Sequence, residues 1–85
     1  MVKSFRLKFG RRIKELRLER GITQEELSFR SGVSRSHIGM IEQGLRDISL
    51  NCIFKISRAL HVPLNELFDF DNLLVYVDNS YLDIY

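Results

Sequence analysis

Apolar residues recur at helical spacing near the start of the chain. Spacings of four, four and three residues place one group of side chains on a single helical face: Phe5, Phe9, Ile13 and Leu16. Basic residues fill much of the remaining surface of this segment, and Gly21 follows it. The pattern therefore predicts an amphipathic helix from Ser4 to Arg20 that ends at Gly21.

Start signals for a second helix are concentrated between residues 22 and 27. Thr23 is placed to cap the helix, and Glu26 follows three residues later, as in a capping box. Ile22 and Leu27 have the spacing of a hydrophobic staple across the same turn. We expect this helix to run to residue 30 or 31 and to end at Gly32.

A third helix is predicted between Ser34, which can cap it, and Gly44, which can take the left-handed turn that ends it. Ile38 and Ile41 give this helix a narrow apolar stripe that faces inward. The opposite face carries side chains that suit contact with base edges better than packing in a core: Arg35, Ser36, Gly39, Met40 and Gln43. Because only residues 31–33 separate this helix from the second, the two form a helix-turn-helix arrangement.

Two more helices complete the predicted fold. After a linker at residues 45–48, Ser49 is placed to cap a fourth helix, whose inward positions are Ile53, Ile56, Ser57 and Leu60. Pro63 is placed to open a short fifth helix through Phe68. The chain is therefore expected to be all-α, with a five-helix domain over residues 1–68 that contains the helix-turn-helix.

The remaining segment, residues 69–85, differs from the helical part. Residues 73–77 are rich in strand-favouring side chains, residues 78–80 carry a turn signal, and residues 81–85 are expected to return as a second strand. So much apolar and aromatic surface is difficult to keep soluble on a monomer. We expect this tail to form a small β-hairpin or dimerisation element, docked on the fifth helix or on the same segment of a second subunit. A disordered tail is the alternative.

Charge divides the chain at the same place. The 85 residues, 45% of them hydrophobic, are enough for one small folded domain. Residues 1–68 hold all 13 Lys and Arg against 7 Asp and Glu, a net charge of +6, whereas residues 69–85 hold four Asp and no base. A basic body favours a polyanion as its partner. A solvated basic surface without such a partner is the alternative.

Other chemistry is not indicated by the sequence. No apolar run approaches the roughly 18 residues of a membrane span, and the first residues lack the apolar core of a secretion signal. The single cysteine, Cys52, fits inert packing in a reducing cytoplasm, and His61 has no second ligand at metal-binding spacing. We expect no enzyme activity, cofactor, metal or small-molecule ligand. Phe29, on the second helix, is expected to be partly buried, with a surface for a partner as the alternative.

Four segments carry a family resemblance. They are Gly-Ile-Thr-Gln-Glu-Glu-Leu from residue 21, Ser-Gly-Val-Ser from 31, Ile-Gly-Met-Ile-Glu-Gln-Gly from 38 and Ile-Ser-Arg-Ala-Leu-His-Val-Pro from 56. Together they resemble the lambda-repressor-like helix-turn-helix family, which includes the Cro proteins and the xenobiotic-response-element class of regulators. Within that family Arg35, Ser36 and Arg46 look most like the controller proteins of restriction-modification systems.

The resemblance implies roles for particular residues at the DNA. Gln24 matches a family position that binds phosphate. Arg35 and Ser36 match base-reading positions, and Met40 matches another position that faces the groove. Arg46 matches a linker arginine that controller proteins use at the DNA.

Elementary chemistry favours the same interface. An arginine fork can donate to both O6 and N7 of guanine, and a helix N-terminus offers free N–H groups to phosphate. Ser34 lies at such a start, while His37 either contacts phosphate or covers the cap, and Gln43 completes the outward face. The resemblance further implies an internal salt bridge between Arg17 and Glu42.

These features predict a sequence-specific DNA-binding transcriptional regulator that acts in the cytoplasm as a homodimer on a two-fold-related, double-stranded operator. The controller of a restriction-modification system is the narrower expectation. A phage-type repressor, or a protein-binding adaptor or antitoxin that uses the same domain, is the alternative. Salt-dependent binding to duplex DNA without a partner protein would distinguish a regulator from an adaptor.

Overall fold

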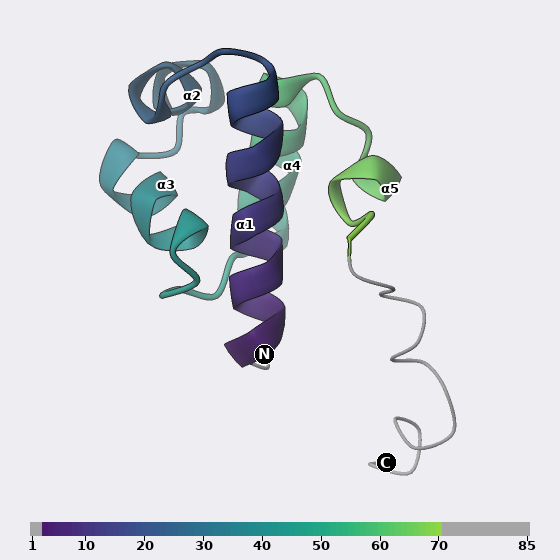
Figure 1. Cartoon of the computed structure of the whole chain (residues 1–85). Coiled ribbons are helices and arrows are strands. Elements are labelled where there is room, and N and C mark those ends of the chain that lie inside the picture. The colour runs from purple at the N-terminus through teal and green to yellow at the C-terminus, as the bar shows by residue number, and fades with distance from the viewer. Residues whose placement is uncertain (1–2, 71–85) are drawn as a thin grey trace, which may run out of the picture.

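Five helices make up the part of the chain that the structure, a computed structural model, describes, namely residues 3–70. In chain order they are α1 (Lys3–Glu19), α2 (Gln24–Ser31), α3 (Arg35–Glu42), α4 (Leu50–Leu60) and α5 (Leu64–Leu67) (Figure 1). The predicted all-α fold is confirmed, and none of these helices is long and apolar enough to cross a membrane. The expected hairpin and dimerisation element fall on residues 71–85, which lie outside the described residues.

The helix ends follow the local sequence signals. Hydroxyl oxygens of Thr23, Ser34 and Ser49 accept hydrogen bonds, at 3.0 or 3.1 Å, from the N–H group three residues later. The three predicted caps are therefore confirmed. The predicted capping box was wrong in its second half, because the Glu26 carboxylate accepts a hydrogen bond from Arg30 Nε at 2.8 Å instead of turning back to the cap.

One apolar core lies between the helices. The largest fully buried side chains are Phe9, Ile13, Leu16, Leu27, Ile38, Ile41, Ile56, Leu60 and Leu67. Helix α2 packs against both α3 and α4, and α1 packs against α3. At Gly10 an added Cβ would collide with the backbone carbonyl oxygen of Ile41, so only glycine permits this close approach of α1 to α3. The predicted inward faces of α1, α3 and α4 are confirmed.

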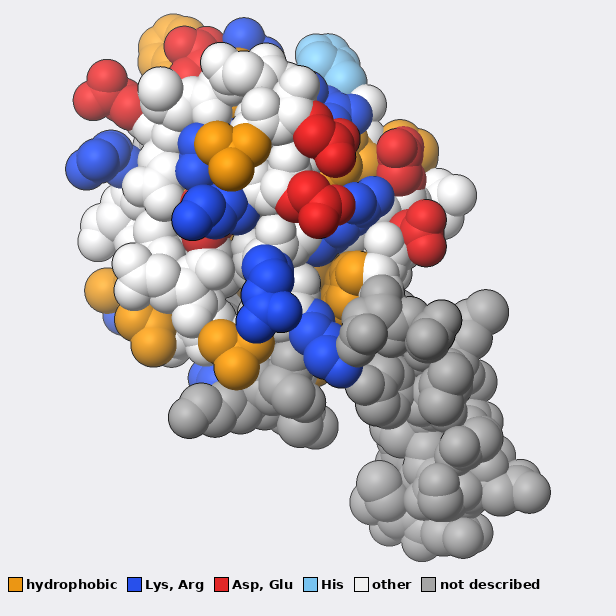
Figure 2. All heavy atoms as spheres, in the orientation of Figure 1, with side chains coloured by type: hydrophobic (Ala, Val, Ile, Leu, Met, Phe, Trp, Pro, Cys, Tyr) orange, Lys and Arg blue, Asp and Glu red, His pale blue; other side chains and the backbone are white. Residues whose placement is uncertain are grey.

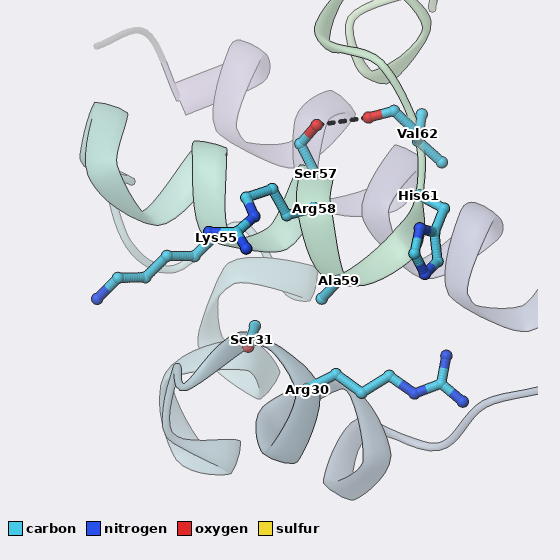
Figure 3. A pocket seen from close by; sticks show the side chains of 8 residues that line it. All are labelled: Arg30, Ser31, Lys55, Ser57, Arg58, Ala59, His61 and Val62. Carbon is cyan, nitrogen blue, oxygen red and sulfur yellow. Dashed lines mark hydrogen bonds between the residues drawn. The ribbon is translucent and has the colours of Figure 1, made fainter.

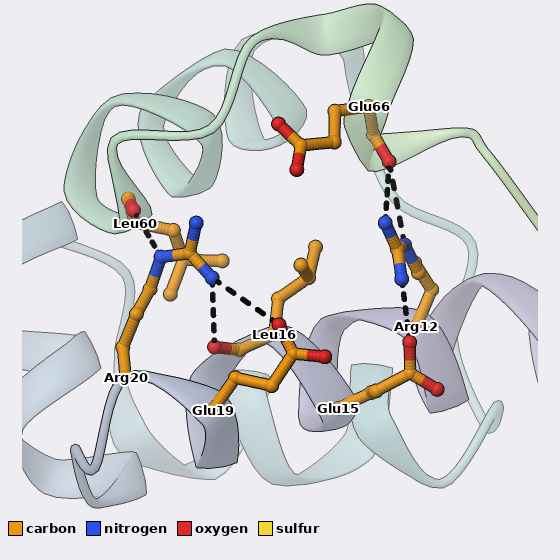
Figure 4. A network of polar contacts seen from close by, with 7 residues as sticks. All are labelled: Arg12, Glu15, Leu16, Glu19, Arg20, Leu60 and Glu66. Atoms are coloured by element: carbon orange, nitrogen blue, oxygen red, sulfur yellow. Dashed lines mark hydrogen bonds and ion pairs between the residues drawn. The ribbon is translucent and has the colours of Figure 1, made fainter.

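Two arginines tie the first helix to the later ones (Figure 4). Arg12 donates from Nη2 and Nε to the carbonyl oxygen of Glu66, at 3.0 and 3.3 Å. Arg20 donates from Nε to the carbonyl oxygen of Leu60, the last residue of α4, at 2.7 Å. Carbonyl groups at a helix end lack intrahelical donors. The contact at Leu60 therefore satisfies such an acceptor, and the two arginines together hold α4 and α5 against α1.

Phenylalanine rings close the core near the start of α1. The ring centroids of Phe9 and Phe68 are 5.2 Å apart, and those of Phe5 and Phe70 are 5.9 Å apart. Aromatic pairs at such distances add to the stability given by area burial alone. The described chain therefore ends packed against the first half of α1.

Candidate nucleic-acid interface

Helix α3 has one buried face and one open face. Ile38 and Ile41 are buried in the core, as predicted. Five of the predicted contact residues are exposed: Ser34, Arg35, Ser36, Gln43 and Arg46. Three are half-buried: Gln24, His37 and Met40. The inner face therefore anchors the helix and leaves its polar outer face available.

The start of α3 is suited to an anion. The Ser34 hydroxyl caps the N–H of His37, and the Ser34 carbonyl accepts from Ile38. Within the described part of the chain, the N–H groups of Arg35 and Ser36 have no acceptor. These free donors lie at the positive end of the helix dipole, which favours negative charge.

The other end of α3 is fixed by a buried polar network. Arg17 Nε donates to Glu42 Oε2 at 2.7 Å and Nη2 donates to Glu42 Oε1 at 3.1 Å, with the two side chains only 8% and 3% exposed. Arg17 also donates to the carbonyl oxygen of Ile22 at 2.8 Å. The implied salt bridge is therefore confirmed, and it joins α1 to the last residue of α3.

Gln24 takes part in the same network. Its Nε2 donates to Glu42 Oε1 at 3.0 Å. Sequence reasoning placed this side chain at phosphate and missed the contact, because its partner lies 18 residues away and only tertiary packing brings the two together.

The linker between α3 and α4 is held at two points. An added Cβ on Gly44 would lie 2.6 Å from Leu7 Cδ2, so this turn sits directly on α1. Asp47 lies 3.5 Å from Arg6 Nε. Arg46, between the two points, is exposed and has no ion pair with any residue that the structure describes. Arg46 follows the C-terminal end of α3, whereas Arg35 lies at the N-terminal end.

The starts of α3 and α4 enclose a small depression, here called the α3–α4 hollow, of about 260 Å³. Its lining includes Ser34 and His37 from the first helix and Asn51 and Lys55 from the second. Sequence reasoning missed Asn51 and Lys55, since nothing local indicates that the start of α4 lies beside the start of α3. Cys52 also lines the hollow, and burial raises the pKa of its thiol, with Lys55 opposing part of the rise.

A larger depression, the α2–α4 cleft, shares Lys55 with the hollow. Figure 3 shows the residues that line this cleft. Its volume is about 720 Å³, and its rim carries Arg30, Lys55, Arg58 and His61. Arg30 is paired with Glu26, and the Arg58 guanidinium lies 5.7 Å from the centre of the Phe54 ring. The cleft therefore continues the basic surface away from α3.

The surface around α1 has a different character. Figure 2 shows basic and acidic side chains mixed on the face where α1 lies. From residue 27 to residue 46, by contrast, Glu42 is the one acid in the sequence, and it is buried against Arg17. Residues 27–46 thus expose no carboxylate, and the next acid, Asp47, lies 3.5 Å from Arg6.

Exposed apolar side chains lie elsewhere. Phe29 is 86% exposed, so its predicted partial burial was wrong. On α4, Leu50 is 86% exposed and Phe54 is 52% exposed, one helical turn apart. These two side chains form an apolar patch on the outer face of α4.

The chain is similar to known helix-turn-helix proteins. A family model described as helix-turn-helix matches residues 13–67. Control protein C.BamHI of Bacillus amyloliquefaciens is 39% identical over 74 residues, which cover 86% of this chain and 91% of that protein. Control protein C.MunI of Mycoplasma is 36% identical over 64 residues, which cover 74% of this chain and 86% of that protein.

Solved structures of controller proteins have the same fold as the described part of this chain. The restriction-modification controller protein C.AhdI from Aeromonas hydrophila superposes with a TM-score of 0.75 at 45% identity, covering 76% of this chain and 98% of that one. The controller protein C.Esp1396I, crystallised as a tetramer in complex with its natural 35 base-pair operator, superposes with a TM-score of 0.71 at 33% identity, covering 75% of this chain and 84% of that one.

Proposed function

This chain belongs to the helix-turn-helix family, and we propose that it is a sequence-specific DNA-binding transcriptional regulator of the restriction-modification controller type. The observation that carries the proposal is the open face of α3. Its polar side chains project from a helix whose inner face is buried and whose far end is fixed by Arg17 and Glu42. A face of that kind on a rigid support is what base reading requires.

Base contacts fall to the outward side chains of α3. Arg35, in the first turn, is placed to donate to O6 and N7 of a guanine, and Ser36 lies beside it. Gln43 can bond an adenine edge, and Met40 can pack against a thymine methyl group. These contacts specify sequence, while the remaining ones fix position.

Phosphate contacts fall to the helix starts and the exposed bases around them. The N-terminal turn of α3, with Ser34 and His37, faces one phosphate group, and the neighbouring Lys55 extends this site across the α3–α4 hollow. At the start of α2 the backbone N–H of Gln24 serves the same purpose, because its side chain is engaged by Glu42. Arg46 is proposed to contact a phosphate of the DNA strand that lies beyond the C-terminal end of α3.

We further propose that the protein acts as a homodimer on a two-fold-related operator. Dimers of this motif read two half-sites about 34 Å apart. The apolar patch of Leu50 and Phe54 on α4 gives the described part of the chain a surface for self-association. The acidic, apolar residues 69–85 are proposed to add to this contact.

Selection of bound sequences from random duplex DNA tests the proposal. We expect one sequence with two-fold symmetry to be enriched by the full chain alone, with an affinity that falls steeply as salt is raised. A scrambled duplex of the same length is the control. Absence of salt-dependent binding to either duplex would favour the adaptor or antitoxin alternative.

A further inference from the structure

We propose that Gln24 is a positioning residue for the recognition helix. Its side chain holds Glu42 at the end of α3, and through this contact it sets how well the protein distinguishes one DNA sequence from another. The inference rests on the proposed function, because it assumes that α3 reads bases. It assigns the Gln24 side chain a part in selectivity through its hydrogen bond to Glu42.

The carboxylate of Glu42 joins three helices. It accepts from Arg17, at the end of α1, through two guanidinium nitrogens at 2.7 and 3.1 Å. It also accepts from Gln24, the first residue of α2, at 3.0 Å. Glu42 itself is the last residue of α3. Besides the apolar packing of its inner face, α3 is therefore held to α1 and α2 through this one buried group.

The chemistry of the pair fixes the orientation of the Gln24 amide. An ionised carboxylate only accepts hydrogen bonds, so the NH₂ group must face Glu42 and the oxygen must face away. The oxygen lies 3.9 Å from the position that a Cβ on Gly39 would occupy. The amide therefore lies over the outward face of α3. One N–H of the amide is used by Glu42, and the second N–H is not needed for that bond.

Selectivity depends on this support more than general affinity does. Base contacts need side chains placed within about 0.5 Å of their productive position. Phosphate attraction is a charge effect that tolerates small shifts. Removing a hydrogen bond to a buried charge should let α3 shift, which weakens contacts such as that of Arg35 and leaves the phosphate attraction nearly unchanged.

The first test uses the full chain with Gln24→Met, which keeps the length of the side chain and removes the donor. Affinity is measured on the selected operator and on a scrambled duplex at several salt concentrations. We expect the ratio of the two affinities to fall about tenfold, with scrambled-DNA affinity and salt slope unchanged. Asn65→Leu, which removes an exposed amide on α5, is the control and should leave the ratio unchanged.

The second test is a pH profile of Gln24→Glu, which keeps the proposal testable even if the methionine variant fails to fold. A second carboxyl group beside Glu42 should have a raised pKa, because two like charges disfavour joint ionisation even with Arg17 present. Selectivity should be poor at about pH 8 and should recover towards about pH 5.5, when one shared proton restores the hydrogen bond. The wild-type ratio, measured at each pH, is the reference.

The outcomes separate the inference from its premise. If Gln24→Met weakens binding to both duplexes by the same factor, the side chain acts on phosphate and the inference is wrong. A Gln24→Glu variant without recovery at low pH would also overturn it. If the wild-type protein itself does not distinguish operator from scrambled DNA, the proposed function fails instead.

Discussion

The two ends of α3 hold the same kind of side chain under opposite conditions. At the C-terminal end, the Arg17 guanidinium is buried and donates to both the Glu42 carboxylate and the Ile22 carbonyl. At the N-terminal end, Arg35 is exposed and has no ion pair with any described residue. A buried arginine without partners would be very costly, whereas an exposed one is hydrated and available to a ligand.

This contrast shows how one helix can combine stability with recognition. At the buried end the polar groups have hydrogen-bond partners inside the protein, so substitutions there should lower the free energy of unfolding. The open end has left donors unsatisfied by protein, so changes there should alter DNA binding and leave folding nearly intact.

The largest effect is expected at the buried end. Glu42→Ala leaves the Arg17 charge buried without its partner, which should cost on the order of 3 to 5 kcal/mol in the free energy of unfolding. Urea denaturation measures this. Glu26→Ala, which removes an exposed partner of Arg30, is the control and should cost less than about 1 kcal/mol. Equal losses for the two variants would mean that the Arg17–Glu42 pair behaves as a surface pair.

A smaller effect is expected where α1 meets α3. Gly10→Ala puts a methyl group against the Ile41 carbonyl, so the two helices must move apart, at a cost of about 1 to 3 kcal/mol in stability. Gly39→Ala is the matched control, because its methyl group meets only the Gln24 amide oxygen at 3.9 Å. Alanine favours a helix interior over glycine, so this control should be as stable as the wild type or more stable. Thermal unfolding of both variants compares the two faces of the molecule directly.

At the open end, binding should change without folding. Arg35→Ala should lose about 1 to 3 kcal/mol on the preferred operator and flatten the preference at one base position in each half-site. The melting temperature should stay within about a degree or two of wild type, because the Arg35 side chain is exposed and exposed side chains contribute little to stability. Binding to single-base operator variants measures the preference. A variant that keeps the full ranking of these sites would show that Arg35 does not read a base.

The parts of the molecule that the sequence predicts are those decided within a few residues. Caps at Thr23, Ser34 and Ser49 depend on one hydroxyl and the next turn of chain, and all three are present. The inward stripe of α3 depends on helical spacing alone. The same spacing could have predicted that Phe29 is exposed. It lies two positions from the buried Leu27, which puts it about 200° around the helix from that side chain.

The parts that the sequence does not predict depend on distant segments. Gln24 meets Glu42 across 18 residues, and nothing near either residue indicates that contact. Lys55 joins the candidate interface only because the start of α4 lies beside the start of α3. Local chemistry identified which residues could contact DNA, whereas packing decides which of their polar atoms remain free to do so.

The smallest effects are expected from the phosphate contacts around α3. Arg46→Ala and Lys55→Gln should each reduce the slope of log affinity against log salt by about one unit, because each removes one positive charge placed against the DNA backbone. Neither should change the ranking of single-base operator variants, since phosphates carry no sequence information. Lys14→Gln, an exposed residue on α1 that lines neither the hollow nor the cleft, removes the same charge and should leave the slope nearly unchanged. An unchanged slope in Lys55→Gln would confine the interface to α3 and its linker. A changed ranking in Arg46→Ala would instead place that side chain in a groove.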